Sequence, residues 1–238
     1  MPYAELPGVR LHYEEAGAGP PLVLLHGIGA SCKDWEYNIP AFARDYRVIA
    51  PDLRGFGRSE RSGNYSVATF ASDIWHLLDQ LQVERFHLIG HSMGGAVALQ
   101  MAVDRPQRLS SAVAGKLFPG PHQQALRDRA TAGGMANDRG VYLETLKQLL
   151  GWSVLEQLDR LIMPVLVLAA EHDYFPVTDA EVFARALHDA HLKIFAGMHH
   201  AVPLEAPQAF NTAVLRFLTG QNAGRALRRK PAGDVKQA

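Results

Sequence analysis

The segment Gly90-His-Ser-Met-Gly94 is a G-x-S-x-G pattern that follows an apolar run and precedes a run of helical character. A sharp strand-to-helix turn holds such a serine in a strained backbone conformation, with its hydroxyl exposed at the edge of the sheet. Glycines on both sides let the chain close around it, and the first N–H groups of the helix can face a developing oxyanion. This context favours Ser92 as a nucleophile over the alternative, a chance pentapeptide at a strand–helix junction.

A serine hydroxyl is a weak nucleophile, so it needs a base and a third group that orients the base. Asp173 comes just after the apolar run Val165–Ala170, and His200 follows the run Leu192–Phe195. If both runs are parallel strands, their carboxyl ends lie at the same sheet edge as Ser92, where ligands gather in open α/β sheets. The chain order of serine, acid and histidine is one that such triads use.

The segment His26-Gly-Ile-Gly29 directly follows another apolar run, Leu22–Leu25. A glycine-flanked turn at this place can aim the backbone N–H of Ile28 at the same point as the N–H of Met93. Two such donors would form an oxyanion hole, in which the removal of one donor typically costs ~10²–10³ in rate. A histidine–glycine pair alone is more often simply a turn, and its place before Ser92 strengthens the functional interpretation.

Alternating strands and helices must position these residues. Apolar runs, buried on both faces, predict parallel strands covered by helices, and the Pro7-Gly8 turn predicts an N-terminal hairpin. The expected strands are Tyr3–Leu6, Val9–Glu15, Leu22–Leu25, Arg47–Ala50, Phe86–Ile89, Ser111–Ala114, Val165–Ala170 and Leu192–Phe195. The expected helices are Val67–Leu81, Met93–Val103, Thr178–Leu187 and Pro203–Leu218. The class is therefore α/β, with a mostly parallel eight-stranded sheet, an antiparallel N-terminal edge and helices on both faces.

Two stretches break this alternation. Residues 116–152 mix Gly, Pro and polar residues with weak helical pieces, as an insertion would. Residues 221–238 hold five basic side chains against one acidic side chain, which is typical of a disordered tail. We expect one core domain, residues 1–115 and 153–220, with a short insertion at 116–152 and a disordered basic tail at 221–238.

Composition excludes several classes of protein. The 238 residues carry 24 basic and 24 acidic side chains, with 20% charged and 47% hydrophobic residues, so the chain is neither disordered nor strongly basic. The balance argues against a nucleic-acid partner, and the single cysteine, Cys32, excludes an internal disulfide. The apolar runs are far shorter than the ~20 residues of a membrane helix, and the N-terminus lacks the pattern of a signal peptide. We expect a cytoplasmic protein without a membrane partner.

On these motifs the chain resembles the α/β-hydrolase superfamily, in particular its branch of small carboxylesterases, enol-lactonases and cofactor-free haloperoxidase-like enzymes. The resemblance extends from Tyr3 to Leu218 and rests on His26-Gly27, Asp52-Leu-Arg-Gly-Phe-Gly-Arg-Ser59, Gly90–Gly94, the Asp173 loop, and His200 followed by Glu205-x-Pro207. It implies an α/β-hydrolase fold in which residues 116–152 form a short cap. It also implies Ser92 as nucleophile, His200 as general base, Asp173 as its acid, and Ile28 and Met93 as oxyanion donors. No metal and no organic cofactor are implied.

The chain departs from the family pattern beside its histidine. The family usually has glycine where His199 stands, so His199 and His200 compete for the role of base; the spacing to Glu205 favours His200. Glu171 competes with Asp173 as the acid, but Asp173 aligns with the aspartate of the family's loop. The neighbouring His26 and His91 are expected to brace loops by hydrogen bonding.

The resemblance favours a serine hydrolase that cleaves small carboxylic esters through an acyl-enzyme on Ser92. The short cap indicates an open cleft and therefore a broad short-chain carboxylesterase. Lactone hydrolysis and carbon–carbon bond hydrolysis on the same triad remain alternatives, and so does a different class, a non-catalytic ligand-binding protein. A histidine base predicts activity that rises with pH through roughly 6–7. Natural substrate and oligomeric state stay open.

Overall fold

The computed structural model describes residues 2–115 and 138–228, with side chains through residue 220. Eight strands form a single sheet in the order β1-β2-β4-β3-β5-β6-β7-β8. The two pairings β1–β2 and β2–β4 are antiparallel, and all others are parallel. The strands are β1 (Tyr3–Leu6), β2 (Val9–Ala16), β3 (Pro21–Leu25), β4 (Arg47–Pro51), β5 (Phe86–Gly90), β6 (Leu109–Gly115), β7 (Val165–Ala170) and β8 (Ala190–Phe195). The predicted α/β class and mostly parallel sheet are therefore confirmed.

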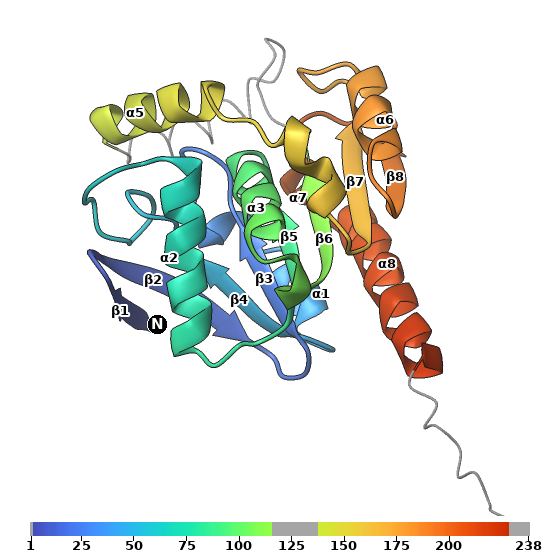
Figure 1. Cartoon of the computed structure of the whole chain (residues 1–238), viewed down its shortest axis with the longest axis horizontal. Coiled ribbons are helices and arrows are strands. Elements are labelled where there is room, and N and C mark those ends of the chain that lie inside the picture. The colour runs from blue at the N-terminus through green and yellow to red at the C-terminus, as the bar shows by residue number, and fades with distance from the viewer. Residues whose placement is uncertain (1, 116–137, 229–238) are drawn as a thin grey trace, which may run out of the picture.

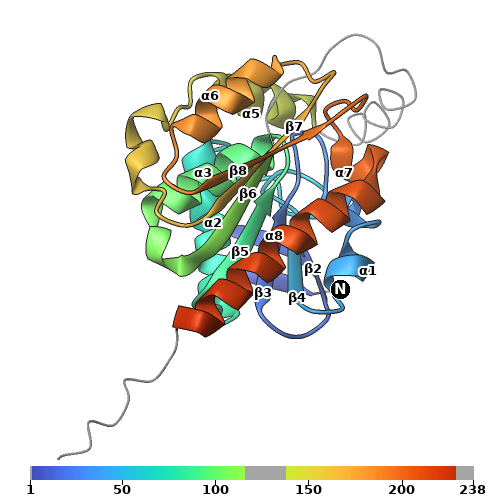
Figure 2. The ribbon, with the colours of Figure 1, turned by 90° about the vertical axis from the view of Figure 1, so that its right-hand side faces the viewer.

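Helices cover both faces of the sheet (Figures 1 and 2). The α-helices are α1 (Ile39–Phe42), α2 (Val67–Gln80), α3 (Met93–Asp104), α5 (Arg139–Leu150), α6 (Val177–Arg185), α7 (Val202–Glu205) and α8 (Pro207–Arg228). Short 3₁₀ helices are η1 (Cys32–Trp35), η2 (Pro106–Arg108) and η3 (Leu155–Arg160). None of the described helices combines the length and the apolarity that a bilayer span requires.

Each face of the sheet has its own apolar core. Alternate residues of one strand go to opposite cores: Val165 and Val167 pack with α2 and α3, whereas Leu166 and Leu168 pack with η1 and α8. This alternation follows from the two-residue period of a strand. In Figure 2, α8 crosses diagonally in front of the sheet. Strands β3, β5, β6 and β7 are covered on both faces, which explains their continuous apolar sequences.

The predicted helix at residues 203–218 is two helices. The break falls at Ala206, whose φ of −137° and ψ of 60° lie outside the helical region. Pro207 causes it, since a proline disfavours the helical conformation of the residue before it while suiting the first turn of a new helix. The sequence contained this signal, and the prediction of one continuous helix was wrong.

The second correction concerns residues 221–238. Helix α8 continues to Arg228, so residues 221–228 are helical and their prediction as a disordered tail was wrong. Alanine, leucine and arginine are good helix formers, and basic residues are favoured near a helix C-terminus, so the charge of this segment was a poor guide. Residues 229–238 lie outside the described residues.

Strand β8 differs from the expected double burial. It lies at the edge of the sheet, and its residues from 191 to 194 are exposed. Its sequence carries His191 and Lys193 among apolar residues, which is typical of an edge strand.

The predicted cap is described only in part. Residues 116–137 lie outside the described residues, and α5 occupies most of the remainder. The Asp138 side chain caps α5 by accepting from the amides of Gly140 and Val141. Val141 is buried and lies so close to Gly55 that a Cβ on that glycine would come within 2.6 Å of Val141 Cγ1. Helix α5 therefore packs on the loop that follows β4.

Candidate active site

The turn between β5 and α3 has the strained geometry that the G-x-S-x-G pattern predicts. Ser92 has φ of 57° and ψ of −127°, a conformation that L-residues rarely adopt. The flanking glycines are sterically required. A Cβ on Gly90 would lie 2.2 Å from the carbonyl oxygen of Gly94, and a Cβ on Gly94 would lie 2.2 Å from that of Leu25.

The turn after β3 lies against Ser92. We call residues 26–31 the β3 turn. A Cβ on Gly27 would stand 3.0 Å from Ser92 Cβ and 3.3 Å from Ser92 Oγ, which is closer than most Cβ contacts, so glycine lets the turn approach the hydroxyl. Ile28 follows in the same turn, and Met93 begins α3. Among the described residues, no backbone carbonyl accepts a hydrogen bond from the amide of Ile28 or Met93. The two amides predicted as oxyanion donors therefore do not donate to a backbone carbonyl of the described residues.

Loops after β7 and β8 bring His200 and Asp173 together. Nδ1 of His200 donates to Asp173 Oδ1 at 3.0 Å, with Oδ2 at 3.3 Å. The His200 side chain is 12% exposed and that of Asp173 is 7% exposed. Nε2 of His200 is buried and makes no hydrogen bond to any described residue. A ring whose Nδ1–H is fixed by a carboxylate carries its lone pair on Nε2, so this nitrogen can accept a proton.

A small cavity of about 20 Å³ lies behind this pair. Asp173, His200 and His91 line it together with apolar side chains that include Leu168 and Phe210. Its size suits one water-sized group. Apolar side chains therefore line most of the small space beside the pair.

The neighbouring histidine has a different partner. His199 Nδ1 donates to Glu205 Oε1 at 2.8 Å, and the His199 amide donates to Glu205 Oε2 at 2.8 Å. Glu171, the competing acid, accepts from the amide of Gly197 at 2.7 Å. The geometry therefore joins His200 to Asp173 and leaves His199 and Glu171 in other hydrogen bonds.

Two rings flank His200. The ring of His91 lies 5.1 Å from it and that of Tyr174 lies 4.9 Å from it, measured between centroids. His91 Nε2 donates to the backbone carbonyl of His200 at 3.0 Å. Burial and the neighbouring His200 lower the pKa of His91 to about 3. His91 is therefore neutral near pH 7 and holds the His200 loop by hydrogen bonding.

His26 fixes one end of the β3 turn. Its Nδ1 donates to the Gly27 carbonyl at 2.7 Å, and its Nε2 accepts from the Leu53 amide at 2.9 Å. Both nitrogens are used and the side chain is fully buried. His26 and His91 thus brace loops, in agreement with the sequence analysis.

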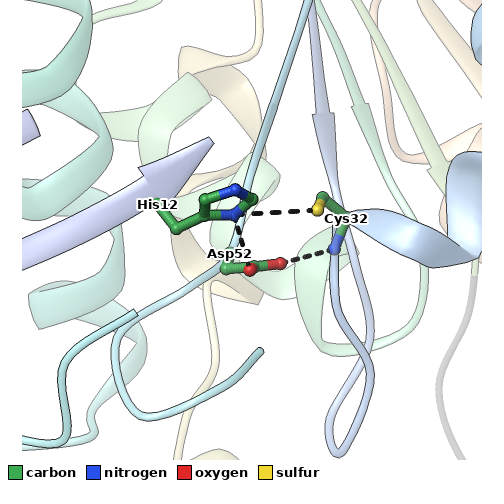
Figure 3. Close-up of side chains that lie close together, drawn as sticks. All are labelled: His12, Cys32 and Asp52. Carbon is green, nitrogen blue, oxygen red and sulfur yellow. Dashed lines mark hydrogen bonds and ion pairs between the residues drawn. The ribbon is translucent and has the colours of Figure 1, made fainter. Parts of the chain in front are cut away.

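A second group of polar side chains was missed by the sequence analysis. His12, Cys32 and Asp52 are buried, and one potential ligand atom from each lies within 4.8 Å of the others (Figure 3). We call these three residues the Asp52 cluster. They come from β2, η1 and the loop after β4, and their sequence spacing matches no motif. Within the described residues it is the one group of three such side chains compact enough to hold a metal ion.

The present hydrogen bonds of the Asp52 cluster argue against a metal site. Nδ1 of His12 donates to Asp52 Oδ2 at 2.9 Å, and His12 Nε2 lies 3.4 Å from Arg58 Nη1. A cation held by Nδ1 would require a proton on Nε2, which would then face the guanidinium donor. The sulfur of Cys32 lies 4.0 Å from the same Nδ1. Burial, Asp52 and Glu14 raise the pKa of the Cys32 thiol, which is therefore protonated.

Comparison with known proteins places this geometry in context. A family model described as the alpha/beta hydrolase fold matches residues 20–117. A protein of Caulobacter sp. (strain K31) named "Putative carbamate hydrolase RutD" is 30% identical over 261 residues, which span 89% of this chain and 97% of that protein.

Two solved structures are similar over nearly their whole length. A hydrolase from Pseudomonas aeruginosa PA01 is 28% identical with a TM-score of 0.81, covering 89% of this chain and 95% of the other. The enol-lactonase from Burkholderia xenovorans LB400 is 22% identical with a TM-score of 0.84, covering 92% and 100%. The second likeness concerns the fold alone.

Proposed function

Because the chain belongs to the α/β-hydrolase family, we propose that it is a serine hydrolase that cleaves small carboxylic esters through an acyl-enzyme on Ser92. Family membership supports hydrolase chemistry, and the geometry around Ser92 supports the acyl-transfer mechanism. The single observation that carries the proposal is the combination of a strained Ser92 with a His200–Asp173 pair whose Nε2 is unpaired among the described residues.

Each residue has a role that follows from its contacts. Ser92 Oγ attacks the ester carbonyl while His200 Nε2 accepts the hydroxyl proton. Asp173 holds the imidazole through Nδ1 and stabilises the imidazolium that forms. The amides of Ile28 and Met93 donate to the carbonyl oxygen as it becomes negative.

The leaving alcohol then takes the proton from His200 Nε2, and the acyl group remains on Ser92. Water attacks this ester in the second half-reaction, with His200 again as base, and releases the acid and free Ser92. His91 contributes no charge to this cycle near pH 7, because its lowered pKa keeps it neutral. The positive charge that develops on His200 is thus not opposed by a second cation on His91.

A carbamate is a second candidate substrate class. The observation in its favour is the 30% identity to a protein named as a carbamate hydrolase over 97% of that protein's length. A carbamate carbonyl is attacked by the same Ser92 and stabilised by the same amides, so the proposed residues would keep their roles. The two classes differ in the group that binds beside the carbonyl.

The test is hydrolysis of a p-nitrophenyl ester series, a matching carbamate series and simple lactones by the wild type and Ser92→Ala. We expect wild-type turnover of short esters and a loss of about 10⁴-fold or more in Ser92→Ala. A fluorophosphonate should label the wild type at Ser92 and leave the variant unlabelled. Absence of turnover on every substrate together with absence of the label would refute the proposal and favour a non-catalytic binding protein.

A further inference from the structure

The carboxylate of Asp52 is the centre of a buried hydrogen-bond network. Oδ1 accepts from the amide of Cys32 at 2.6 Å, and Oδ2 accepts from the amide of Arg58 and from Nδ1 of His12, both at 2.9 Å. The side chain is 1% exposed. Gly57 allows this arrangement, because a Cβ there would lie 2.3 Å from the carboxylate. The loop after β4 is therefore folded around one carboxylate.

Asp52 is ionised in this environment. Burial alone would raise its pKa, but the nearby His26 and the amides of Cys32 and Arg58 lower it further than burial raises it. Hydrogen bonds to an ionised acceptor are stronger and shorter than those to a neutral one. The short contact from Cys32 to Oδ1 fits this description.

The hydrogen bond to Cys32 fixes the far end of the β3 turn (Figure 3). The near end is fixed by the Leu53 amide, which donates to His26 Nε2 at 2.9 Å. Two consecutive residues of the β4 loop, Asp52 and Leu53, thus hold the β3 turn at both ends. Ile28 lies between the two anchors, in the part of the turn that contacts Ser92.

We propose that Asp52 is a positioning residue, which sets the Ile28 amide at the oxyanion site through its hydrogen bond to the Cys32 amide. The inference rests on the proposed acyl chemistry at Ser92 and adds a residue that touches neither substrate nor Ser92. An oxyanion donor acts only when it is aimed at the developing charge, and a displacement of about 1 Å can cost ~10²-fold in rate.

The arrangement of the Asp52 cluster excludes a second catalytic triad in the same place. In a cysteine–histidine–aspartate triad the acid and the nucleophile face different ring nitrogens. Here Asp52 and Cys32 both face Nδ1 of His12, and Nε2 faces Arg58. The cluster positions backbone groups and does not activate its thiol.

The amide of Cys32 can be removed without changing Asp52. Cys32 is the first residue of η1, and its N-cap, Ser31, is extended at φ −158° and ψ 179°. Proline is well tolerated at the first helical position and after an extended residue. Cys32→Pro therefore deletes the N–H that binds Asp52 and places the ring Cδ where that hydrogen lay, so the carboxylate is displaced as well, while Cys32→Ala deletes only the thiol. The difference between the two variants measures the loss of the whole contact between the backbone at residue 32 and Asp52.

Activity must be expressed per folded active site, so that loss of fold is not mistaken for loss of positioning. Titration of Ser92 with a fluorophosphonate counts these sites. A trifluoromethyl ketone is the second probe, because its tetrahedral adduct with Ser92 places an oxyanion where the substrate's would form. Asp52→Asn weakens the same contact by a second route, because a neutral amide oxygen is a weaker acceptor than a carboxylate. Asp73→Asn, which alters a buried carboxylate bound to Arg54, is the control for general destabilisation.

We expect kcat per site to fall about 10- to 100-fold in Cys32→Pro relative to Cys32→Ala, with KM changed less than about threefold. The inhibition constant of the ketone should rise by the factor by which kcat/KM falls, since both report the oxyanion. Asp52→Asn should follow the same relation, whereas Asp73→Asn should lower the folded fraction and leave kcat per site unchanged.

Equal kcat per site and equal ketone affinity in the two Cys32 variants would overturn the positioning role. So would a fall in kcat of Asp52→Asn that the Asp73→Asn control reproduces. A wild type without turnover and without label would instead refute the proposed function itself, so the two failures are distinguishable.

Discussion

Two histidine–aspartate pairs in this molecule are joined by the same kind of hydrogen bond, from Nδ1 of the ring to the carboxylate. They differ in the groups that surround this bond. Nδ1 of His12 lies 2.9 Å from Asp52 Oδ2, and Nδ1 of His200 lies 3.0 Å from Asp173 Oδ1. Cys32 lies beside the first pair, with its sulfur 4.0 Å from His12 Nδ1, and Ser92 is the nucleophile proposed to act with the second. Distance alone would not separate them.

The two pairs differ in the contacts of the second ring nitrogen, Nε2. His12 Nε2 faces the guanidinium of Arg58, which is a donor under all ordinary conditions. His200 Nε2 makes no hydrogen bond to a described residue. The first pair is a closed network in which the carboxylate accepts from three donors and both ring nitrogens of His12 face polar groups, and the second keeps one acceptor available. A catalytic pair is therefore recognised by the group that it leaves unpaired, and a structural pair by the completeness of its hydrogen bonds.

The largest expected effect tests whether the His200–Asp173 pair is the catalytic one. It compares kcat after substitution of Asp173 and after substitution of its neighbour Glu171. Asp173→Asn should lower kcat by about 10⁴-fold, because the amide cannot hold His200 in the tautomer with a free Nε2. Glu171→Gln is the matched control, since Glu171 binds the Gly197 amide and lies two residues away. We expect that control to change kcat by less than about threefold. Equal losses in both variants would mean that the loss is not particular to Asp173 and would contradict its role as the acid.

The free energy of unfolding should depend more on Asp52 than on Asp173, in contrast to kcat, which should depend strongly on Asp173. Asp52→Ala leaves the amides of Cys32 and Arg58 and the Nδ1 of His12 without their buried acceptor, which should cost about 3–5 kcal/mol of unfolding free energy. Asp173→Ala should cost less, about 1–2 kcal/mol, because its carboxylate serves fewer donors. Urea unfolding of both variants measures the difference. A larger loss in Asp173→Ala would contradict the distinction between closed and open pairs.

A smaller effect should appear in the pH dependence of stability. The pKa of His91 is lowered to about 3 in the folded protein, against about 6.5 in an unfolded chain. Between these values the unfolded state binds the additional proton, so stability is fully present above about pH 6.5 and falls as pH decreases toward 3. The slope from this one group is at most about 1.4 kcal/mol per pH unit.

The variant His91→Gln should lose this contribution. Its unfolding free energy should depend less steeply on pH than that of the wild type between about pH 4 and 6. Urea unfolding at several pH values measures the two slopes. Parallel slopes in the two proteins would show that His91 is not held neutral by the fold, and the bracing of His200 would need another explanation.

The helices and strands, and the residues of the His200–Asp173 pair, could largely be named from the sequence. Each strand was found within two residues of its bounds. The inner parallel strands have continuous apolar sequences, and the N-terminal hairpin is marked by its Pro7-Gly8 turn. Ser92, Asp173 and His200 could be named because each follows such a strand, and one sheet edge collects them. The distinction between His199 and His200 needed the resemblance, since sequence position alone left both open.

The closed pair could not be predicted in the same way. His12, Cys32 and Asp52 lie on three separate elements, and the contacts that join them depend on the register of β2 against β4 and on the path of the β3 turn. No spacing rule links such residues. The break at Pro207 is a different case: its local signal was present in the sequence, and helical periodicity on both sides concealed it.

The last expected effect concerns the Cys32 thiol beside the His12–Asp52 pair. The cysteine thiolate is the reactive form, and burial, Asp52 and Glu14 raise the pKa of the Cys32 thiol. The side chain is 2% exposed. Iodoacetamide should therefore label Cys32 in the native protein more slowly than in urea, by about 10²-fold or more, with kcat unchanged during the incubation. Mass spectrometry of the labelled protein at pH 8 gives the labelling rate. The raised pKa also affects stability: above the unfolded pKa near 8.5 the native thiol keeps its proton while the unfolded thiol loses it, so the stability that this group contributes is lost as pH rises beyond 8.5. A native rate faster than that of the unfolded chain would mean that His12 activates the thiol, and the two pairs would then be alike in chemistry as well as in geometry.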